Sequence, residues 1–453
     1  MTKKLKKVHQ PVAEKTREDK VEAAELQADN CLADAVRRVA LASIGAVALA
    51  SDELRILGNK LIERGEIVEN NGRKRLMEVI ERTQEQMRPA DAKTIGAPKY
   101  LPYADNVESV PAGEEDDIRK VVQSIEQILQ ESHEKSGKPL PDVHAKSHGC
   151  AKGEFRVLPN LPEELAQGLF RHPRTYDAVV RFSNSSGQMN PDSKPDGRGM
   201  AIKVIGVAGA KLLADEKNAK TQDFVMIDHP VFLVGTVEHY RRVEQVLADA
   251  GDNGFMQILG LALTGDSDIP RHIAELIRAA EIGGHRAANP VSMTYYSMAP
   301  IRFGQYVAKY RVEPVQDGDH ALRPSLTTPG SAEDALRLLL EETLRQQEVL
   351  FNFQVQLRTS EQTMPVEDAT VEWPESESPY RTVATFRIFR QDIASRREAG
   401  DNLSFTVWHA LAAHRPLGGI NRVRREAYRT SSVWRHQEAG KVRKEPDSIT
   451  EIP

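Results

Sequence analysis

Two groups of residues in this chain have types and spacings that suit chemistry. In the first, His144 lies within the segment VHAK, and an imidazole can accept and return a proton near neutral pH. In the second, Tyr428 follows Arg424 by four residues and precedes Arg435 by seven, within NRVRREAYRTSSVWRHQ. A phenol has a pKa of ~10, and an arginine one helical turn away favours its phenolate form. The sequence therefore offers a proton-transfer base and a phenol with an arginine one helical turn away.

Two further segments carry polar side chains on predicted strands. Arg181 and Ser183 alternate along VRFSN, so they face the same side of a strand. The apolar segment DFVMIDHPVF ends in charged residues, with Asp228 just before a His-Pro pair. Each feature also has a purely structural interpretation. A histidine at a strand edge is often a satisfied structural imidazole, and the arginine-tyrosine pattern also fits a basic surface helix with one exposed tyrosine.

The composition excludes several classes of protein. The 453 residues include 61 Lys and Arg against 66 Asp and Glu, a net charge of -5, and no basic block is long enough to follow a nucleic-acid backbone. Two cysteines, Cys31 and Cys150, exclude a disulfide framework. The longest apolar run, Val39 to Ala50, is well short of the ~20 residues that a membrane span needs. We expect a soluble, cytoplasmic protein with no nucleic-acid partner and no transmembrane segment.

The elements that must position these residues fall into two domains. Residues 1–28 are rich in Lys and Glu and predict a flexible charged tail. Residues 29–95 have helical periodicity with a break at Asn71-Gly72, which predicts a helical hairpin. Prolines follow this region, and we place a domain boundary near residue 95. The second domain is then expected over residues 96–453.

The second domain combines helices with many short strands. A helix is predicted over Glu114 to Glu134, helical patterning over residues 236–283, and a helix capped by Ser331 over SAEDALRLLLEETLRQQE. SMTYYSMAPIRFG and YVAKYRVEP predict an antiparallel hairpin. The other predicted strands are FRVLP after a Gly-containing turn, AVVRFSN, GMAIKVIG, DFVMIDHPVFLV, FNFQVQLRT, ATVEW and YRTVATFRIFR. The pattern indicates an α+β domain built around a barrel or strongly curled sheet.

The order and spacing of these segments resemble the catalase superfamily over about 300 residues, from about 140 to 436. Catalases have a strand with His-Ala-Lys, then a VRFS strand and an RG-x-A-x-K strand. Their iron-ligating tyrosine follows one arginine by four residues and precedes another by seven. The resemblance implies an α+β fold with a catalase-like antiparallel β-barrel and surrounding helices, preceded by an N-terminal helical region. It also implies haem b as the cofactor.

The resemblance implies a role for each candidate residue. His144 would move a proton between the two peroxide oxygens, Ser183 would steady it, and Asp228 would stand in for a missing polar group. Tyr428 would be the metal ligand. The implied cofactor contacts are Val143, Arg181, Phe232, Arg424, Tyr428 and Arg435. Arg302 and Tyr306 repeat the spacing of four, but they lie in a predicted hairpin with Gly304 between them, so we expect Tyr306 to be barrel packing.

The chain departs from the catalase pattern at three places. The distal asparagine is absent, because the corresponding residues are Ile227, Asp228 and His229. The arginine usually found three residues before the distal histidine is Pro141. About 25 residues follow Tyr428, so no C-terminal nucleotide-binding portion is expected. The chain looks like the short branch that includes catalase-related peroxidases and fatty-acid hydroperoxide isomerases or lyases.

These observations predict a haem-dependent peroxidase or catalase-like enzyme acting on hydrogen peroxide or organic, including fatty-acid, hydroperoxides. One alternative is hydroperoxide isomerisation or cleavage without net redox change. The other is a non-catalytic granule or surface-coat protein, because RVALASIGAVALASDELRILGNKLIERGEIVENNGRKR loosely resembles phasins. That resemblance implies a peripheral contact with a lipid or granule surface. A helical hairpin that drives oligomerisation is the other interpretation, and we expect a homo-oligomer.

Overall fold

A computed structural model describes residues 100–250, 278–279, 281–285, 287–326, 329–330 and 332–452. The predicted tail over residues 1–28, the predicted helical hairpin over residues 29–95 and the boundary near residue 95 lie outside these residues. So does Ser331, the predicted helix cap. Among the described residues, no helix has the length and hydrophobicity that crossing a bilayer would require.

Eight antiparallel strands close into a β-barrel, which confirms the predicted α+β barrel fold. Going round the barrel, each of β1, β2, β3, β4, β5, β7, β8 and β9 pairs with the next, and β9 pairs back with β1. Strand β6 extends the sheet as a hairpin with β7. The strands are β1 (Ser147–Val157), β2 (Thr175–Asn184), β3 (Arg198–Ile205), β4 (Thr221–Ile227), β5 (Tyr295–Tyr296), β6 (Ile301–Phe303), β7 (Tyr306–Pro314), β8 (Val349–Leu357) and β9 (Arg381–Ile388).

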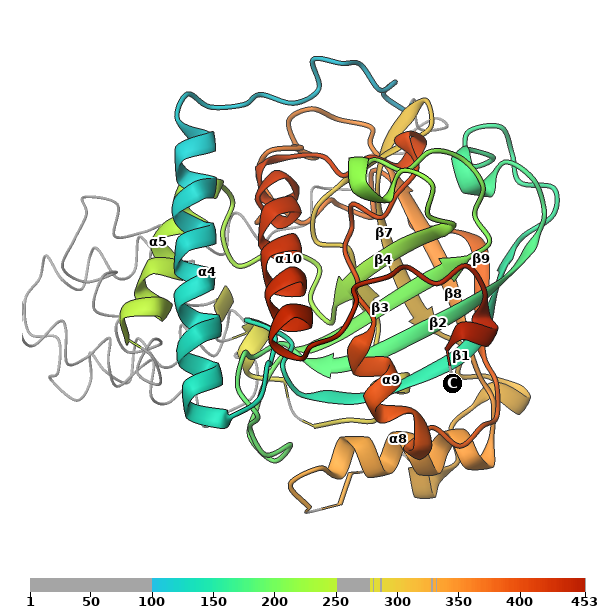
Figure 1. The fold of residues 1–453 in the computed structure, drawn as a ribbon. Coiled ribbons are helices and arrows are strands. Elements are labelled where there is room, and N and C mark those ends of the chain that lie inside the picture. The colour runs from blue at the N-terminus through green and yellow to red at the C-terminus, as the bar shows by residue number, and fades with distance from the viewer. Residues whose placement is uncertain are drawn as a thin grey trace, which may run out of the picture. The chain divides into compact units, whose positions relative to one another are not determined.

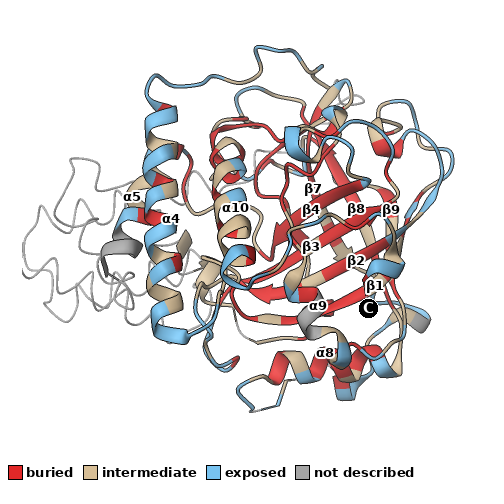
Figure 2. Ribbon diagram, viewed as in Figure 1, coloured by how far each residue is buried: buried red, intermediate tan, exposed pale blue. Residues whose placement is uncertain are grey.

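Aromatic side chains fill the inside of the barrel, and the strands that surround them are mostly buried (Figure 2). The rings of Phe224 and Phe353 lie 4.6 Å apart between centroids, and those of Phe155 and Phe353 lie 5.2 Å apart. Side chains alternate across each strand, so where Phe182 points into this core, its neighbours Arg181 and Ser183 point to the outer face. The barrel core therefore fixes which polar side chains reach the outer surface of β2.

Helices α4 (Glu114–Ser136), α5 (Val237–Ala250) and α10 (Gly419–Glu438) lie together on one side of the barrel, and α8 (Ala335–Gln346) lies at another edge, at the bottom of Figure 1. Helix α9 spans Arg397–Asn402. Val121, Ile125 and Leu129 recur every four residues along one face of α4 and pack against Val423 and Ala427 of α10. This contact lays α4 along α10, and α10 lies next to the strands (Figure 1).

Most of the predicted elements of this domain are present. The helix predicted from Glu114 is α4, and SMTYYSMAPIRFG with YVAKYRVEP contains the antiparallel hairpin of β6 and β7. As predicted, Tyr306 packs against the barrel, where its ring meets that of Tyr100 edge-on at 6.2 Å. The segment NRVRREAYRTSSVWRHQ is helical within α10.

One predicted strand is absent, and two predicted boundaries were wrong. ATVEW is not a strand: Ala369 and Trp373 are buried in an irregular segment, where they pack against two small hydrophobic clusters. The glycine-containing turn before GEFRV is instead part of β1, which begins at Ser147 and absorbs an irregularity between Ser147 and Gly149. Helix α8 begins only after Asp334. For ATVEW the apolar pattern indicated burial correctly but not the backbone conformation that provides it.

Candidate functional site

A cavity of about 780 Å³ lies between the outer face of the barrel and the helices α5 and α10. Its wall joins the segment before β1, the outward-facing residues of β2 and β3, and one face of α10. Eight of the nine predicted site residues lie on this wall. They are Val143, His144, Arg181, Ser183, Phe232, Arg424, Tyr428 and Arg435.

His144 occupies the segment that leads into β1, in a left-handed conformation with φ of 57°. Its backbone N–H donates to the Ser185 carbonyl at 3.1 Å. Its side-chain Nδ1 lies 2.8 Å from the Asn184 carbonyl oxygen and 3.1 Å from Ser183 Oγ. Because a carbonyl oxygen can only accept, Nδ1 carries the proton and the lone pair of the neutral ring lies on Nε2.

The surroundings of His144 keep its imidazole neutral. Burial and the nearby Arg181 guanidinium lower the pKa of His144 to about 4, although the Asn184 carbonyl opposes them. Desolvation disfavours the charged ring, and a neighbouring cation disfavours it further. At neutral pH the residue is therefore an imidazole with a free basic nitrogen.

Gly199 on β3 makes room for this histidine, and Gly199→Ala should displace it. A Cβ at this position would lie 2.6 Å from His144 Nδ1 and 2.7 Å from Ser183 Oγ. We expect the bond from Nδ1 to Asn184 to break and the fold to lose about 1–3 kcal/mol from overpacking. Histidine ¹⁵N NMR would report the loss of the Nδ1–H tautomer. Gly330→Ala, where a Cβ meets nothing within 4 Å, is the control, and an unchanged His144 signal in Gly199→Ala would contradict the expectation.

Tyr428 and Arg424 face the cavity from α10. Arg424 is 3% exposed, and its Nη2 donates to the Tyr428 hydroxyl at 2.9 Å. Its Nη1 donates to Asn421 Oδ1 at 3.2 Å, which holds the guanidinium in place. The ring of Tyr428 packs against apolar residues that include Val225 and Val407. The phenol oxygen thus has a fixed cationic partner one helical turn away, as the sequence spacing predicted.

Two more arginines gather at another part of the wall. Arg181 donates to the His144 carbonyl at 3.0 Å, and Arg435 donates to the Leu403 carbonyl at 3.1 Å. Burial lowers the pKa of Arg435 to about 10, and the charge of Arg181 adds to the effect. Asp401, which is half exposed, lies 3.9 Å from Arg181 and offsets the two charges only in part. This arrangement suits an anionic group such as a carboxylate.

Asp228, the ninth predicted residue, is not among the described residues that line the cavity. Its Oδ1 accepts a hydrogen bond from the backbone N–H of Arg198 at 2.8 Å, and its Oδ2 lies 2.7 Å from His285 Nδ1. The carboxylate therefore joins the start of β3 to a neighbouring loop. Ile227 lies on the wall instead. The side chain that was expected to replace the missing asparagine is thus directed to another contact.

Two carboxyl groups on the wall were missed by sequence reasoning. Burial raises the pKa of Asp142, and burial together with the charge of Asp142 raises the pKa of Glu244 to about 7. The backbone N–H of Asp142 donates to Ser431 Oγ of α10 at 3.5 Å. No spacing in the sequence marks Asp142 and Glu244 as a pair, since the fold brings them together from segments about 100 residues apart.

No family model matches this chain, and no curated protein matches it. Solved structures do resemble it in fold. Catalase A from Saccharomyces cerevisiae is 14% identical, with 81% of this chain and 77% of that chain covered and a TM-score of 0.47. A fungal catalase (14% identity, 81% and 73% covered, TM-score 0.45) and a bacterial catalase (14%, 81% and 69%, TM-score 0.48) are similar to the same degree.

Proposed function

We propose that this chain binds haem b through Tyr428 and reacts with a peroxide, using His144 as the proton-transfer base. The observation that carries the proposal is the cavity wall itself. It combines an imidazole with a free Nε2 and a phenol held by Arg424, although these residues are about 280 positions apart in the sequence. The resemblance of the sequence segments to catalases supports the same assignment.

The residues present fit a haem group. The cavity volume of about 780 Å³ lies within the ~300–1,000 Å³ that is usual for cofactor pockets. The phenol has the cationic neighbour that its phenolate form needs. Apolar side chains such as Val143 and Phe232 line the wall, and Arg181 and Arg435 could pair with the two propionates. Arg435 is partly buried beside a second guanidinium, so an anion at this position would relieve an unfavourable charge arrangement.

Bound haem would supply a ferric iron that coordinates the peroxide and changes oxidation state. The chain's own contribution is proton transfer. His144 Nε2 can take the proton from one peroxide oxygen and return it to the other as the O–O bond breaks. The hydrogen bond from Nδ1–H to the Asn184 carbonyl holds the ring in the tautomer that this step needs, and Ser183 supports the same nitrogen.

The test of the cofactor assignment is an absorption spectrum of the purified chain after reconstitution with haem. We expect a strong Soret band with a high-spin ferric tyrosinate pattern and one haem per chain. A chain that stays colourless would favour the granule or surface-coat interpretation.

Oxidation of an external donor should exceed oxygen release. Oxygen release requires a second peroxide to be held beside the histidine, and Ile227 on the wall offers no hydrogen bond for this. The measurement is oxygen evolution and donor oxidation on one preparation. Ile227→Asn should raise oxygen release, and Ile227→Leu is its control. Oxygen evolution by the unchanged chain at the rate of a full-length catalase would contradict this prediction.

A second candidate function is rearrangement of an organic hydroperoxide without net redox change. It is favoured by the apolar part of the wall, which includes Leu233, Val243 and Ile282 near Phe232 and would accept an alkyl chain. Product analysis with a fatty-acid hydroperoxide separates the two candidates. Rearranged products formed without consumption of a donor would replace the peroxidase assignment.

A further inference from the structure

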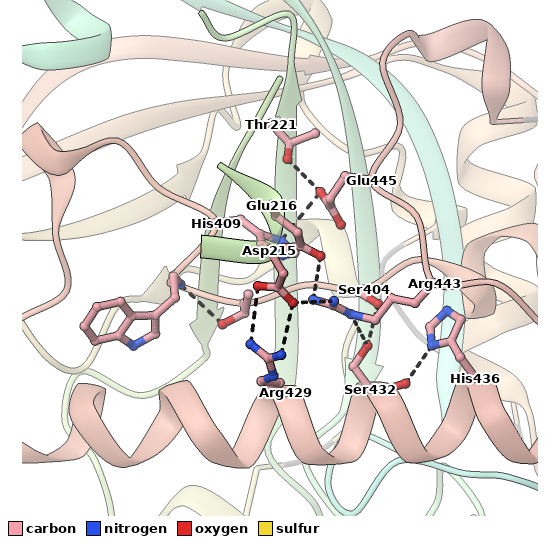
Figure 3. A network of polar contacts seen from close by, with 12 residues as sticks. Asp215, Glu216, Thr221, Ser404, His409, Arg429, Ser432, His436, Arg443 and Glu445 are labelled. Atoms are coloured by element: carbon pink, nitrogen blue, oxygen red, sulfur yellow. Dashed lines mark hydrogen bonds and ion pairs between the residues drawn. The ribbon is translucent and has the colours of Figure 1, made fainter. Parts of the chain in front are cut away.

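A group of buried charges joins the barrel to the C-terminal segment beyond α10 (Figure 3). Lys203 on β3 is fully buried, and its Nζ lies 2.8 Å from each Asp223 oxygen and 2.6 Å from Glu445 Oε2. Thr221 also donates to Glu445 Oε2, at 2.6 Å. Glu445 is thus held by two groups of the barrel that lie more than 220 residues before it in the sequence.

His409 lies at the centre of this group with a carboxylate on each ring nitrogen. Nδ1 lies 2.8 Å from Asp223 Oδ2, and Nε2 lies 2.5 Å from Glu216 Oε2. Burial and Lys203 lower the pKa of His409, but Asp223 and Glu445 outweigh them and raise it to about 9. At neutral pH the ring is therefore an imidazolium, which donates from Nδ1 to Asp223 and forms an ion pair with Glu216 through Nε2.

The charges of the group balance. We call the six residues the C-terminal ion cluster: Lys203, Glu216, Asp223, His409, Arg443 and Glu445. It has three carboxylates and three cations. Three possible metal-ligand atoms, one each from Glu216, His409 and Glu445, lie within 4.8 Å of one another, close enough to coordinate one metal ion. The side-chain cations already neutralise the carboxylates, so the cluster is complete without a metal.

Two arginines connect this region to α10 (Figure 3): Arg443 of the cluster, and Arg429 of α10 itself, which lies 3.2 Å from Asp215. Arg443 Nη2 lies 2.7 Å from Glu216 Oε1, and its Nε donates to Ser432 Oγ at 3.1 Å. Ser432 Oγ also lies 2.6 Å from Ser404 Oγ. Ser432 is one helical turn after Tyr428 and lies on the cavity wall with it.

One face of α10 borders the cavity, and polar contacts hold the helix on either side of Tyr428. Near its start, Arg422 is anchored by ion pairs of 2.6–2.8 Å to Glu108, Glu114 and Glu367. After Tyr428, the link from Ser432 to Arg443 ties it to the buried charges of the barrel. Tyr428 lies between these two anchor points.

We propose that Arg443 and Glu445 are positioning residues: through the C-terminal ion cluster they hold α10, and with it Tyr428, against the barrel. Their effect on cofactor retention rests on the proposed function. Their effect on α10 does not, and it can be measured in the haem-free chain.

The first experiment measures hydrogen exchange of α10 amides in the haem-free chain. Glu445→Gln removes one charge of the buried cluster, and Arg443→Met removes the contacts of Arg443 to Ser432, Glu216 and Asp215. Both should speed exchange around Tyr428 by about tenfold or more while β1–β3 stay protected. Glu451→Gln, which breaks the exposed pair with Lys444, is the matched control. Unchanged exchange of α10 in Arg443→Met would overturn the proposal.

The second experiment measures transfer of haem from the loaded chain to a competing haem-binding protein. Both cluster variants should lose haem about tenfold faster or more, and Glu451→Gln should match the unchanged chain. A chain that retains no haem contradicts the proposed function, while the exchange experiment still decides whether the cluster positions α10. Variants with faster α10 exchange but unchanged haem loss would overturn the link to cofactor retention.

The third experiment uses pH. The folded-state pKa of His409 is above its ordinary value of 6.5, so its stabilising charge is present at neutral pH and is lost as the pH rises through about 9. The protection of α10 amides, measured as their exchange rate relative to an unfolded amide at the same pH, should fall over this range. Asp223, Glu216 and Glu445 would then face only the positive charges of Lys203 and Arg443. His409→Gln should lack this step. The same alkaline step in His409→Gln would exclude His409 as its source.

Discussion

Tyr428→Phe should abolish haem retention or weaken it severely. A phenyl ring fills nearly the same space but offers no oxygen to the iron, so the ligand is lost while the helix is retained. The hydrogen bond of 2.9 Å from Arg424 also loses its acceptor, and Arg424 is almost fully buried, where an unpaired charge is costly. The measurement is the ratio of Soret to protein absorbance after reconstitution and gel filtration.

Tyr306→Phe is the matched control because Arg302 precedes Tyr306 by four residues, as Arg424 precedes Tyr428. Tyr306 begins β7 and is not among the described residues that line the cavity. Haem content should therefore be unchanged. Retention by Tyr428→Phe together with loss by Tyr306→Phe would overturn the assignment of the ligand.

His144→Ala should retain haem but react with peroxide about 100-fold more slowly or worse, the usual effect of losing a positioned acid-base group. The hydrogen bond from Arg424 to Tyr428 lies within α10 and does not involve His144. The measurement is the rate of spectral change when peroxide is mixed with the haem-loaded chain. An unchanged rate would remove His144 from the mechanism. His148, which also borders the cavity, would then be the next histidine to replace.

The pH dependence provides a second readout of the same prediction. The pKa of His144 is lowered from 6.5 to about 4, so the neutral ring is the folded form throughout the neutral range. The folded chain loses stability only as the pH falls below 6.5, the ordinary pKa of a histidine in the unfolded chain. The folded ring itself becomes protonated near pH 4. The rate should therefore be level from pH 6 to 8 and fall at about pH 4. His144→Ala should show no such fall.

The sequence determined the features of this site that depend on local periodicity. A spacing of four on a helix puts two side chains on the same face, and Arg424 does bond to the Tyr428 hydroxyl. Alternation along a strand likewise puts Arg181 and Ser183 on one face of β2, and both line the cavity. The same periodicities gave the antiparallel hairpin of β6 and β7 and the helix α4.

Only the tertiary structure decided which distant groups meet. Asp228 was expected to stand in for the missing asparagine, yet its carboxylate accepts the backbone N–H of Arg198 and lies 2.7 Å from His285 Nδ1. Asp142 and Glu244 face the same cavity, and Lys203 meets Glu445 although 242 residues separate them. Such contacts have no signature in the sequence, because they depend on how the closed barrel and the covering helices direct each side chain. Periodicity gives the face on which a residue lies, but the partner on the other side is set by the packing of the whole domain.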